Sequence, residues 1–325
     1  MLVLTAADVR AVLDMPTAME TTLEAARAHV AGRTSASGRV ALSTAAPAGE
    51  YLVMPGTVGD DRFGVKTWYT ASHGGAWSTR ALVLVLDPET GDEVLMDGSV
   101  ITDLRTGAMT GIAATHLAPP DASVATVIGA GAQARTQALA LAVALPGLTT
   151  LRVTSRTAPR RDALVAALTR ELAPYGIEVV GVDDTAMACR GADVVVAATT
   201  SSSPVVRQEW LGADVLVCGV GSHAPGAAEL DPRTVAAAEV VAVDTRAGGI
   251  DGAGDISRPI ADGLLRRQDV LELGELGERE LPRSGIRVFK SAGFAAADVT
   301  AGHHVARAAR AAGLGLRIDL HGPAT

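Results

Sequence analysis

The 325-residue sequence is poor in aromatic residues and in cysteine. Phe, Trp and Tyr together make up 3% of the chain, so the hydrophobic core has to be built from aliphatic side chains. The two cysteines, Cys189 and Cys218, lie in apolar stretches, where we expect them to be small buried side chains. They supply neither a disulfide framework nor a Cys-x-x-Cys site, and we predict no bound metal.

The sequence also lacks an excess of basic residues and long apolar runs. Its formal net charge is −8, which argues against a nucleic-acid or anionic-membrane partner, because either would require a basic face. No uninterrupted apolar run approaches the roughly 18 residues of a membrane span. Residues 1–14 contain acids and show no signal-peptide pattern. We therefore expect a soluble, cytoplasmic protein.

The pattern of apolar and turn-forming residues changes along the chain. Residues 40–116 alternate short β-type runs with turn signals, which is typical of an antiparallel sheet. Residues 104–118 return to helical spacing and lead to Pro119-Pro120, where we expect a domain boundary. From residue 123 onward, strands that are apolar on both faces alternate with helical segments, which predicts a parallel, doubly wound sheet.

The stretch VIGAGAQA, residues 127–134, follows an apolar strand and opens a helix. This is the setting in which a Gly-x-Gly-x-x-Gly/Ala loop binds the pyrophosphate of a dinucleotide. Gly129 permits the tight turn, and Gly131 lets backbone amides approach the pyrophosphate at the helix N-terminus. The loop residues Ala132 and Gln133 complete this predicted contact. The alternative is an ordinary turn that favours glycine, but the further strands that follow favour a nucleotide site.

The end of the next strand predicts which dinucleotide binds. No carboxylate stands where an NAD enzyme would hold the ribose 2′-hydroxyl. Arg156, followed by Arg160 and Arg161, can instead meet a 2′-phosphate, and the hydroxyls of Ser155 and Thr157 can donate to it. The alternative is a set of three surface arginines at the start of an exposed helix. We predict NADP(H), with NAD(H) as the second possibility.

Several further stretches stand out beside this loop: MPG with GVKTW (54–68), VITDLRTGAMTGIAATHLA (100–118), GVGSHAPGAAELDP (219–232), ELGE (275–278) and VFKSAGFAAAD (288–298). These stretches resemble the ornithine cyclodeaminase/mu-crystallin family. With VIGAGAQA, they follow one another in the family's order along nearly the whole chain.

The resemblance implies an α/β protein with two domains. A Rossmann domain with a doubly wound parallel sheet, residues 119–295, would be inserted into a second, α+β domain. That domain would comprise residues 1–118, bind the substrate and form a homodimer, and be rejoined by a C-terminal helix within 296–325. The insertion would explain why the nucleotide loop comes late in the sequence.

Members of the family act on α-amino or α-imino acids, whose carboxylate requires cations. By resemblance, Arg39 and Arg105 correspond to substrate-binding arginines, and Lys66 to the active-site lysine. Each alone is also compatible with a surface charge, but their common order makes that interpretation weaker. Arg80 is a candidate second cation for a dicarboxylic substrate, or a solvated residue at a strand edge.

Two positions depart from the cyclodeaminase pattern. Leu52 stands where cyclodeaminases have Glu, and His223 stands where they have Asp. Those carboxylates serve proton handling and amine recognition in the cyclisation of a diamino acid, so their absence argues against ornithine cyclodeamination. His223 remains a candidate proton donor, because the pKa of histidine lies near neutrality. The alternative is a histidine that is simply hydrogen-bonded in a loop.

The sequence thus predicts an NAD(P)H-dependent oxidoreductase that reduces the C=N bond of an α-imino acid or ketimine, or oxidises the corresponding L-amino acid. Two alternatives remain open: a cyclodeaminase of ornithine or lysine with bound NAD, and a non-catalytic protein that binds NADPH and a small ligand. The resemblance also implies that Thr106, Thr199, Lys290 and Ser291 lie near the cofactor, and we expect Val220 there as well.

Overall fold

The structure, a computed structural model, describes residues 1–36, 38–45, 48–73, 76–222, 224–320 and 322. The chain divides into two compact units: the first unit comprises Met1–Arg105 and Phe294–Thr325, and the second unit comprises Thr106–Gly293. The first boundary therefore falls inside one continuous helix, α3 (Gly98–Leu117), and not at Pro119-Pro120. Among the described residues, no helix has the length and apolar character that crossing a membrane requires.

The first unit is built on a mixed, eight-stranded sheet. The strand order is β16-β1-β7-β6-β5-β4-β2, and β3 pairs with β4. β1 and β7 run parallel, and the other pairs are antiparallel, as the sequence predicted for residues 40–116. The strands are β1 (Leu2–Leu4), β2 (Thr34–Ala36), β3 (Val40–Ala45), β4 (Ala48–Val58), β5 (Arg62–His73), β6 (Ala76–Leu86), β7 (Glu93–Asp97) and β16 (Leu316–Arg317).

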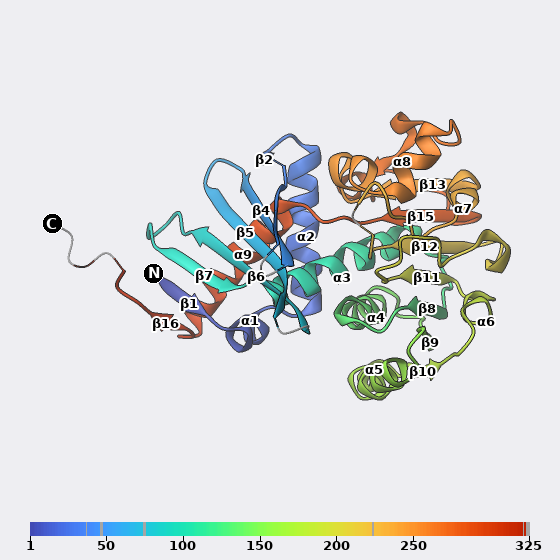
Figure 1. Ribbon diagram of the computed structural model, residues 1–325, viewed down its shortest axis with the longest axis horizontal. Coiled ribbons are helices and arrows are strands. Elements are labelled where there is room, and N and C mark those ends of the chain that lie inside the picture. Colours follow the sequence, from blue (N-terminus) through green and yellow to red (C-terminus); the bar gives the residue numbers. More distant parts are fainter. Residues whose placement is uncertain (37, 46–47, 74–75, 223, 321, 323–325) are drawn as a thin grey trace. The chain divides into compact units, whose positions relative to one another are not determined.

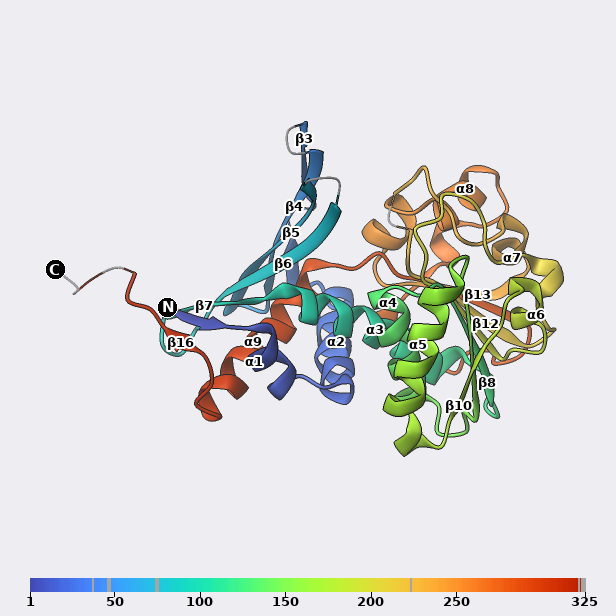
Figure 2. The same cartoon turned by 60° about the horizontal axis from the view of Figure 1, so that its bottom comes forward.

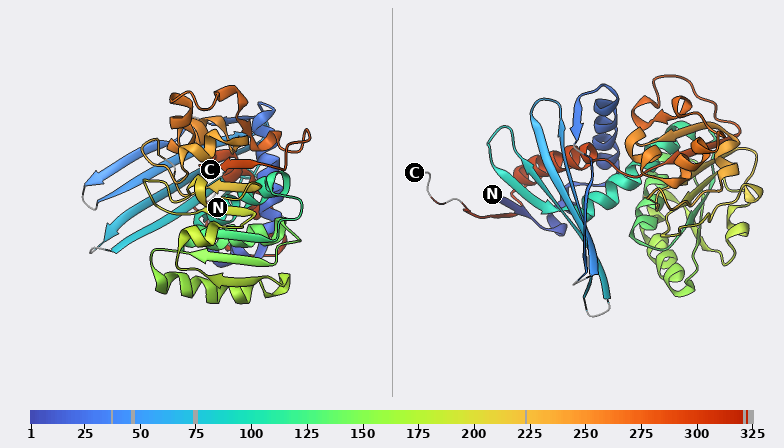
Figure 3. Two further views of the ribbon diagram at one scale, coloured as in Figure 1. Left: turned by 90° about the vertical axis from the view of Figure 1, so that its right-hand side faces the viewer. Right: turned by 45° about the horizontal axis from the view of Figure 1, so that its top comes forward.

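Helix α9 lies against one face of this sheet and packs in turn against α2 (Figure 3). The helices of the first unit, besides the start of α3, are α1 (Ala6–Val12), α2 (Met15–Val30) and α9 (Ala295–Ala311). Gly302 allows the close approach, because a Cβ atom there would lie 2.9 Å from Cγ1 of Val85 and 3.1 Å from Cγ1 of Val83. The last helix of the chain thus completes a unit that the first residues begin.

Strand register decides which side chains face α9. Lys66 on β5 lies opposite Met54 on β4 and Val83 on β6, so these three side chains share one face of the sheet. The opposite face carries large apolar side chains that are at least 39% exposed. They are Val40, Leu42, Tyr51, Phe63, Leu82 and Leu86, which we call the outer apolar face.

The second unit is the predicted doubly wound sheet, with eight parallel strands in the order β10-β9-β8-β11-β12-β15-β13-β14. Helices α4 and α5 lie on one face, and α6 and α7 on the other (Figures 1 and 2). The strands are β8 (Val124–Ile128), β9 (Thr150–Thr154), β10 (Glu178–Gly181), β11 (Val194–Ala197), β12 (Val215–Gly219), β13 (Ala238–Val243), β14 (Leu271–Glu272) and β15 (Ile286–Lys290).

The α-helices of the second unit, besides the end of α3, are α4 (Ala132–Ala144), α5 (Ala158–Glu171), α6 (Thr185–Cys189), α7 (Pro232–Ala236) and α8 (Gly254–Ala261). The 3-10 turns are Ala173–Tyr175, Gln208–Trp210, Arg267–Asp269 and Leu273–Glu275, and Arg246–Asp251 is a π-helical turn.

The strand order places a ligand site by a simple rule. From β8 the chain adds β9 and β10 on one side, and then returns to place β11 on the other side of β8. Ligands of open α/β sheets bind at such a switch point, beyond the carboxyl ends of the strands. The segments that follow β8, β9, β11, β12 and β15 therefore share one edge, and they carry most of the residues predicted to bind the cofactor.

Candidate active site

The turn after β8 has the geometry that a dinucleotide loop requires. Gly129 has φ of +121°, and a Cβ atom there would lie 2.3 Å from the carbonyl oxygen of Ala198, so only glycine fits. Gly131 is the N-cap of α4, with no side-chain cap, and a Cβ atom there would meet nothing within 4 Å. The N-terminus of α4, which begins with Ala132 and Gln133, is therefore open to an anion that its backbone amides and dipole can bind.

The segment after β9 presents two unpaired arginines. Arg156 and Arg160 are exposed, and neither side chain has a hydrogen bond or ion pair with a described residue. Arg161 differs, because it forms ion pairs with Asp162 and Asp183 and is therefore occupied. The hydroxyl of Ser155 accepts a weak hydrogen bond, 3.4 Å long, from the backbone N–H of Thr157. Two of the three predicted arginines thus remain available to a phosphate.

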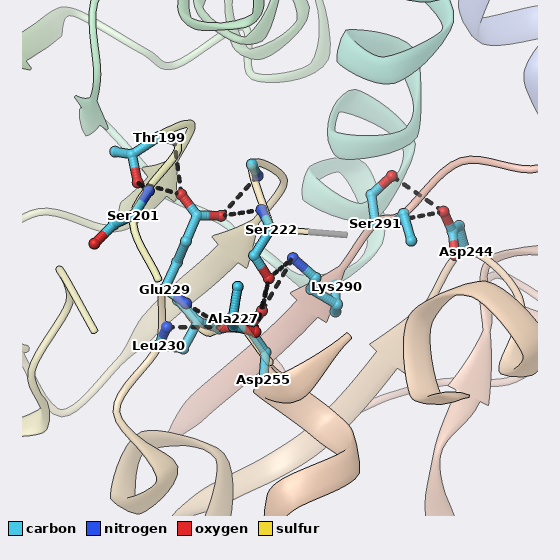
Figure 4. A network of polar contacts seen from close by, with 12 residues as sticks. Thr199, Ser201, Ser222, Ala227, Glu229, Leu230, Asp244, Asp255, Lys290 and Ser291 are labelled. Carbon is cyan, nitrogen blue, oxygen red and sulfur yellow. Dashed lines mark hydrogen bonds and ion pairs between the residues drawn. The ribbon is translucent and has the colours of Figure 1, made fainter. Parts of the chain in front are cut away.

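Glu229 ties together the segments that follow β11 and β12 (Figure 4). Its Oε1 accepts hydrogen bonds from the backbone N–H and hydroxyl of Thr199, at 2.7 and 2.8 Å. Its Oε2 accepts from the backbone N–H groups of Gly221 and Ser222, at 2.6 and 3.0 Å. Burial raises the pKa of Glu229, and Lys290 and these hydrogen bonds oppose that shift. The side chain of Thr199 is therefore used inside the protein.

Lys290 at the end of β15 is also engaged internally (Figure 4). Its Nζ lies 3.1 Å from Oδ2 of Asp255 and 3.3 Å from Oγ of Ser222, and its side chain is fully buried. The hydroxyl of Ser291 donates to Oδ2 of Asp244 at 3.2 Å. Contact of Lys290 or Ser291 with a cofactor remains a prediction, but both side chains already have partners.

Two more predicted cofactor residues lie in the second unit. Thr106 belongs to α3, and its carbonyl oxygen accepts a hydrogen bond from Nε2 of Gln137 at 3.3 Å. Val220 directly follows β12, and its backbone N–H donates to the carbonyl oxygen of Ala197 at 2.9 Å. Val220 thus lies at the carboxyl edge of the sheet, where the switch point predicts a ligand.

The first unit contains a buried cluster of three charges, which we call the charge cluster: Lys66 on β5, Arg105 on α3 and Asp298 on α9. Oδ1 of Asp298 accepts hydrogen bonds from Nζ of Lys66 at 3.2 Å and from Nε of Arg105 at 3.0 Å. The three residues are 3%, 5% and 1% exposed, respectively. Two cations face one carboxylate, so the charge cluster carries an excess of one positive charge.

Burial alters the protonation of the charge cluster. It lowers the pKa of Lys66 to about 8; Asp298 opposes this shift, while Arg105 and Arg39 reinforce it. Burial acts to raise the pKa of Asp298, but Arg105 and Lys66 outweigh it and hold that pKa below its usual range. The carboxylate of Asp298 is therefore ionised at neutral pH. The ammonium of Lys66 loses its proton at a pH just above neutral.

Arg105 has unused hydrogen-bonding capacity. Among the described residues, Asp298 is the only one that forms a hydrogen bond or ion pair with its side chain, and it does so through Nε. Both terminal nitrogens are left for another acceptor. A guanidinium fork matches a carboxylate in two parallel hydrogen bonds, so this end of Arg105 suits a carboxylate ligand.

The other predicted substrate residues have different positions. Arg39 is half-buried, directly precedes β3, and is close enough to influence the pKa of Lys66. Arg80 is exposed and pairs with Tyr69 across β5 and β6, which puts it on the sheet face opposite Lys66. The geometry favours the solvated interpretation of Arg80. His223 lies outside the described residues, so its predicted role as proton donor stays a prediction.

Asp298 is the candidate site residue that the sequence reasoning missed. It ends the stretch VFKSAGFAAAD, which carried part of the family resemblance, but it was not selected as a site residue. The signal was a single acid in an alanine-rich helix that is otherwise apolar around it. A carboxylate in that setting requires a buried cation as partner.

The fold and these sites together define a dinucleotide-binding α/β protein with a buried cationic cluster. The chain belongs to the ornithine cyclodeaminase/mu-crystallin family, whose model matches residues 1–312.

Similar proteins include two curated relatives. A delta-1-pyrroline-2-carboxylate reductase of Bacillus cereus is 29% identical and covers 98% of this chain and 100% of its own. An uncharacterized cyclodeaminase of Sinorhizobium fredii is 36% identical, but the match covers 61% of this chain and only 60% of that protein.

Among solved structures, the delta-1-pyrroline-2-carboxylate reductase of Thermococcus litoralis, in complex with NADH and L-proline, superposes with a TM-score of 0.89. It is 28% identical, and the match covers 98% of this chain and 100% of that one.

Proposed function

We propose that the protein uses a nicotinamide cofactor to reduce the C=N bond of an α-imino acid or ketimine, and in reverse oxidises the corresponding L-amino acid. The observation that carries the proposal is the charge cluster, with its excess positive charge and the unused fork of Arg105. The full-length relatives support it, because the Bacillus cereus and Thermococcus litoralis proteins are reductases of a cyclic imino acid.

In this mechanism, Lys66 and Arg105 bind the substrate carboxylate and fix the orientation of the neighbouring C=N bond. The gain comes from positioning and from charge complementarity in a site with little water. A nicotinamide bound beyond the carboxyl ends of β8 and β9 would supply the hydride for the imine carbon, and with the proton on nitrogen the C=N bond would become the CH–NH of the product. The imine nitrogen is readily protonated beforehand, and we retain His223 as the proposed donor of that proton.

The charge cluster of Lys66, Arg105 and Asp298 suits one substrate carboxylate. One anion neutralises the excess charge of Lys66, Arg105 and Asp298, and the position of Arg80 on the opposite sheet face does not suit a second carboxylate. Leu52 shares the face of Lys66, through its pairing with Trp68, so an apolar side chain stands where cyclodeaminases have Glu. This favours reduction over cyclodeamination.

The direct test is the oxidation of NADPH, followed at 340 nm, with a panel of cyclic imino acids and of 2-oxo acids with ammonia or methylamine. We expect turnover with a monocarboxylic imino acid. The protein should also be assayed for ammonia release from ornithine and lysine with NAD. Ammonia release without imine reduction would establish a cyclodeaminase, and silence in both assays would favour a binding protein.

The pKa of Lys66 predicts a pH dependence. Lys66 is charged below its pKa of about 8 and neutral above it, so kcat/KM for the imino acid should fall as the pH rises through about 8. This ratio reports groups of the free enzyme. In a Lys66→Arg variant the charge persists at every accessible pH, so this basic limb should disappear. An identical limb in both proteins would contradict the assignment.

We propose NADP(H) as the preferred cofactor. The glycines and the open N-terminus of α4 suit the pyrophosphate, and the unpaired Arg156 and Arg160 suit a 2′-phosphate at the end of β9. NADH in the Thermococcus litoralis relative belongs to that protein and leaves the choice open here.

Substitution of Arg156 tests this preference. A charge-assisted hydrogen bond contributes about 1.5–3 kcal/mol, so Arg156→Ala should raise KM for NADPH roughly 10- to 150-fold. KM for NADH should change less than about 2-fold, because that cofactor lacks the phosphate. Arg170→Ala, an exposed substitution at the other end of α5, is the matched control. Equal effects of Arg156→Ala on both cofactors would refute the preference.

We further propose a homodimer formed through the outer apolar face. An exposed apolar patch of this kind on one sheet face is typical of a protein interface. The mass in solution should be twice the 33.0 kDa of one chain, as measured by analytical ultracentrifugation. Leu82→Glu should give a monomer, whereas Leu264→Glu, at a similarly exposed leucine of the second unit, should not. A monomeric wild type would disprove the dimer.

A further inference from the structure

Among the residues that the structure describes, four acids are no more than 1% exposed, and Asp298 differs from the other three. Glu229, Asp255 and Asp244 each accept hydrogen bonds on both carboxylate oxygens, and each binds backbone N–H groups. Oδ1 of Asp298 binds two cationic side chains, and its Oδ2 is buried without a hydrogen-bond partner among the described residues. Glu229, Asp255 and Asp244 hold loops together, whereas the partners of Asp298 are only the two cations.

Stability does not explain such an arrangement well. Replacing a buried ion cluster with packed apolar side chains is often neutral or stabilising, because burying the charges costs desolvation. The carboxylate oxygen without a partner adds to that cost. The charge cluster of Lys66, Arg105 and Asp298 therefore calls for a role beyond holding β5, α3 and α9 together.

The mode of contact indicates this role. Asp298 engages Arg105 through Nε, and this contact leaves both terminal nitrogens of the guanidinium for a ligand. The same oxygen also binds the ammonium of Lys66, so one atom sets the positions of both cations. The carboxylate of Asp298 lowers the electrostatic cost of burying the two cations. An excess of one positive charge remains.

We propose that Asp298 is a positioning residue for the substrate carboxylate: it directs the fork of Arg105 toward the ligand and keeps Lys66 in its charged form. The proposal deepens the proposed function and rests on it. Asp298 does not touch the reacting atoms in this account. It acts through the two cations, and its effect is on the binding of the carboxylate.

Several charged groups act on Lys66, and they have different signs. Asp298 on α9 raises the pKa of Lys66, while Arg105 on α3 and Arg39 before β3 lower it. Asp103 on α3 also interacts with Lys66 and Arg105, and it is half-buried. Asp103 is therefore the control residue for Asp298. The same two cations act on it electrostatically, but it does not bridge them through one oxygen.

The test compares Asp298→Asn with Asp103→Asn by measuring kcat/KM for imino acid reduction across pH. Loss of the Asp298 charge should move the basic limb to lower pH by at least about one unit. It should also raise KM at least about tenfold, with a smaller effect on kcat, because carboxylate binding is shared by ground and transition states. Asp103→Asn should shift the limb by less than about half a unit.

A uniform loss of activity at every pH, with the limb unmoved, would mean that Asp298 is only structural. If Asp298→Asn does not fold, Asp298→Glu decides the matter. It keeps the charge but moves the oxygen, so the limb should stay near pH 8 while KM rises. An unchanged KM in Asp298→Glu would overturn the proposal.

A binding experiment separates this inference from the proposed function. Cyclopentanecarboxylate has a carboxylate and no nitrogen, and its affinity for the NADPH complex can be titrated across pH by calorimetry. The pH dependence of its affinity should shift downward in Asp298→Asn even if no imine is ever reduced, in which case only the reductase assignment fails. Imine reduction with an unshifted titration would overturn the role of Asp298 alone.

Discussion

The charge cluster of Lys66, Arg105 and Asp298 is the constraint around which the first unit is organised. Its members come from a strand, a helix and the last helix of the chain, and Asp298 lies 232 residues from Lys66 and 193 from Arg105. Two buried cations without this carboxylate would repel each other in a site that water barely reaches. The return of α9 to the sheet therefore completes the site chemically as well as structurally.

The second unit also contains buried acids, and these bind backbone N–H groups. The carboxyl ends of its parallel strands have to stay in place beside a nucleotide, although the segments that follow them are irregular. Glu229, Asp255 and Asp244 accept hydrogen bonds from backbone N–H groups of those segments. Buried acids thus bind loop backbone in this unit, whereas in the first unit the buried carboxylate of Asp298 binds two cationic side chains.

Local sequence patterns predicted much of this architecture. The loop at Gly129 and Gly131 was recognisable because its requirements are local: a strand, a tight turn and a helix N-terminus. Alternating and continuous apolar runs likewise distinguished the antiparallel sheet from the parallel one. Lys66 and Arg105 required the family resemblance, because a single charged residue carries little information alone.

Features that depend on distant contacts were not predictable. The pairing of Arg161 with Asp183 depends on β9 and β10 lying side by side, and it removes one arginine from the predicted phosphate site. The domain boundary lies inside α3 because packing, and not Pro119-Pro120, divides the units. Asp298 was missed because its partners are distant in sequence. Strands as short as β14 and β16 leave no periodic signal.

The central claim is that Lys66 and Arg105 recognise the carboxylate of an imino acid. The most direct measurement compares kcat/KM for a five-membered cyclic imino acid with that for its methyl ester, in the wild type and in Arg105→Met. With about 1.5–3 kcal/mol per charge-assisted hydrogen bond, the wild type should prefer the acid by roughly 100-fold or more, and Arg105→Met should lose most of that preference. Equal reduction of acid and ester by the wild type would contradict the account.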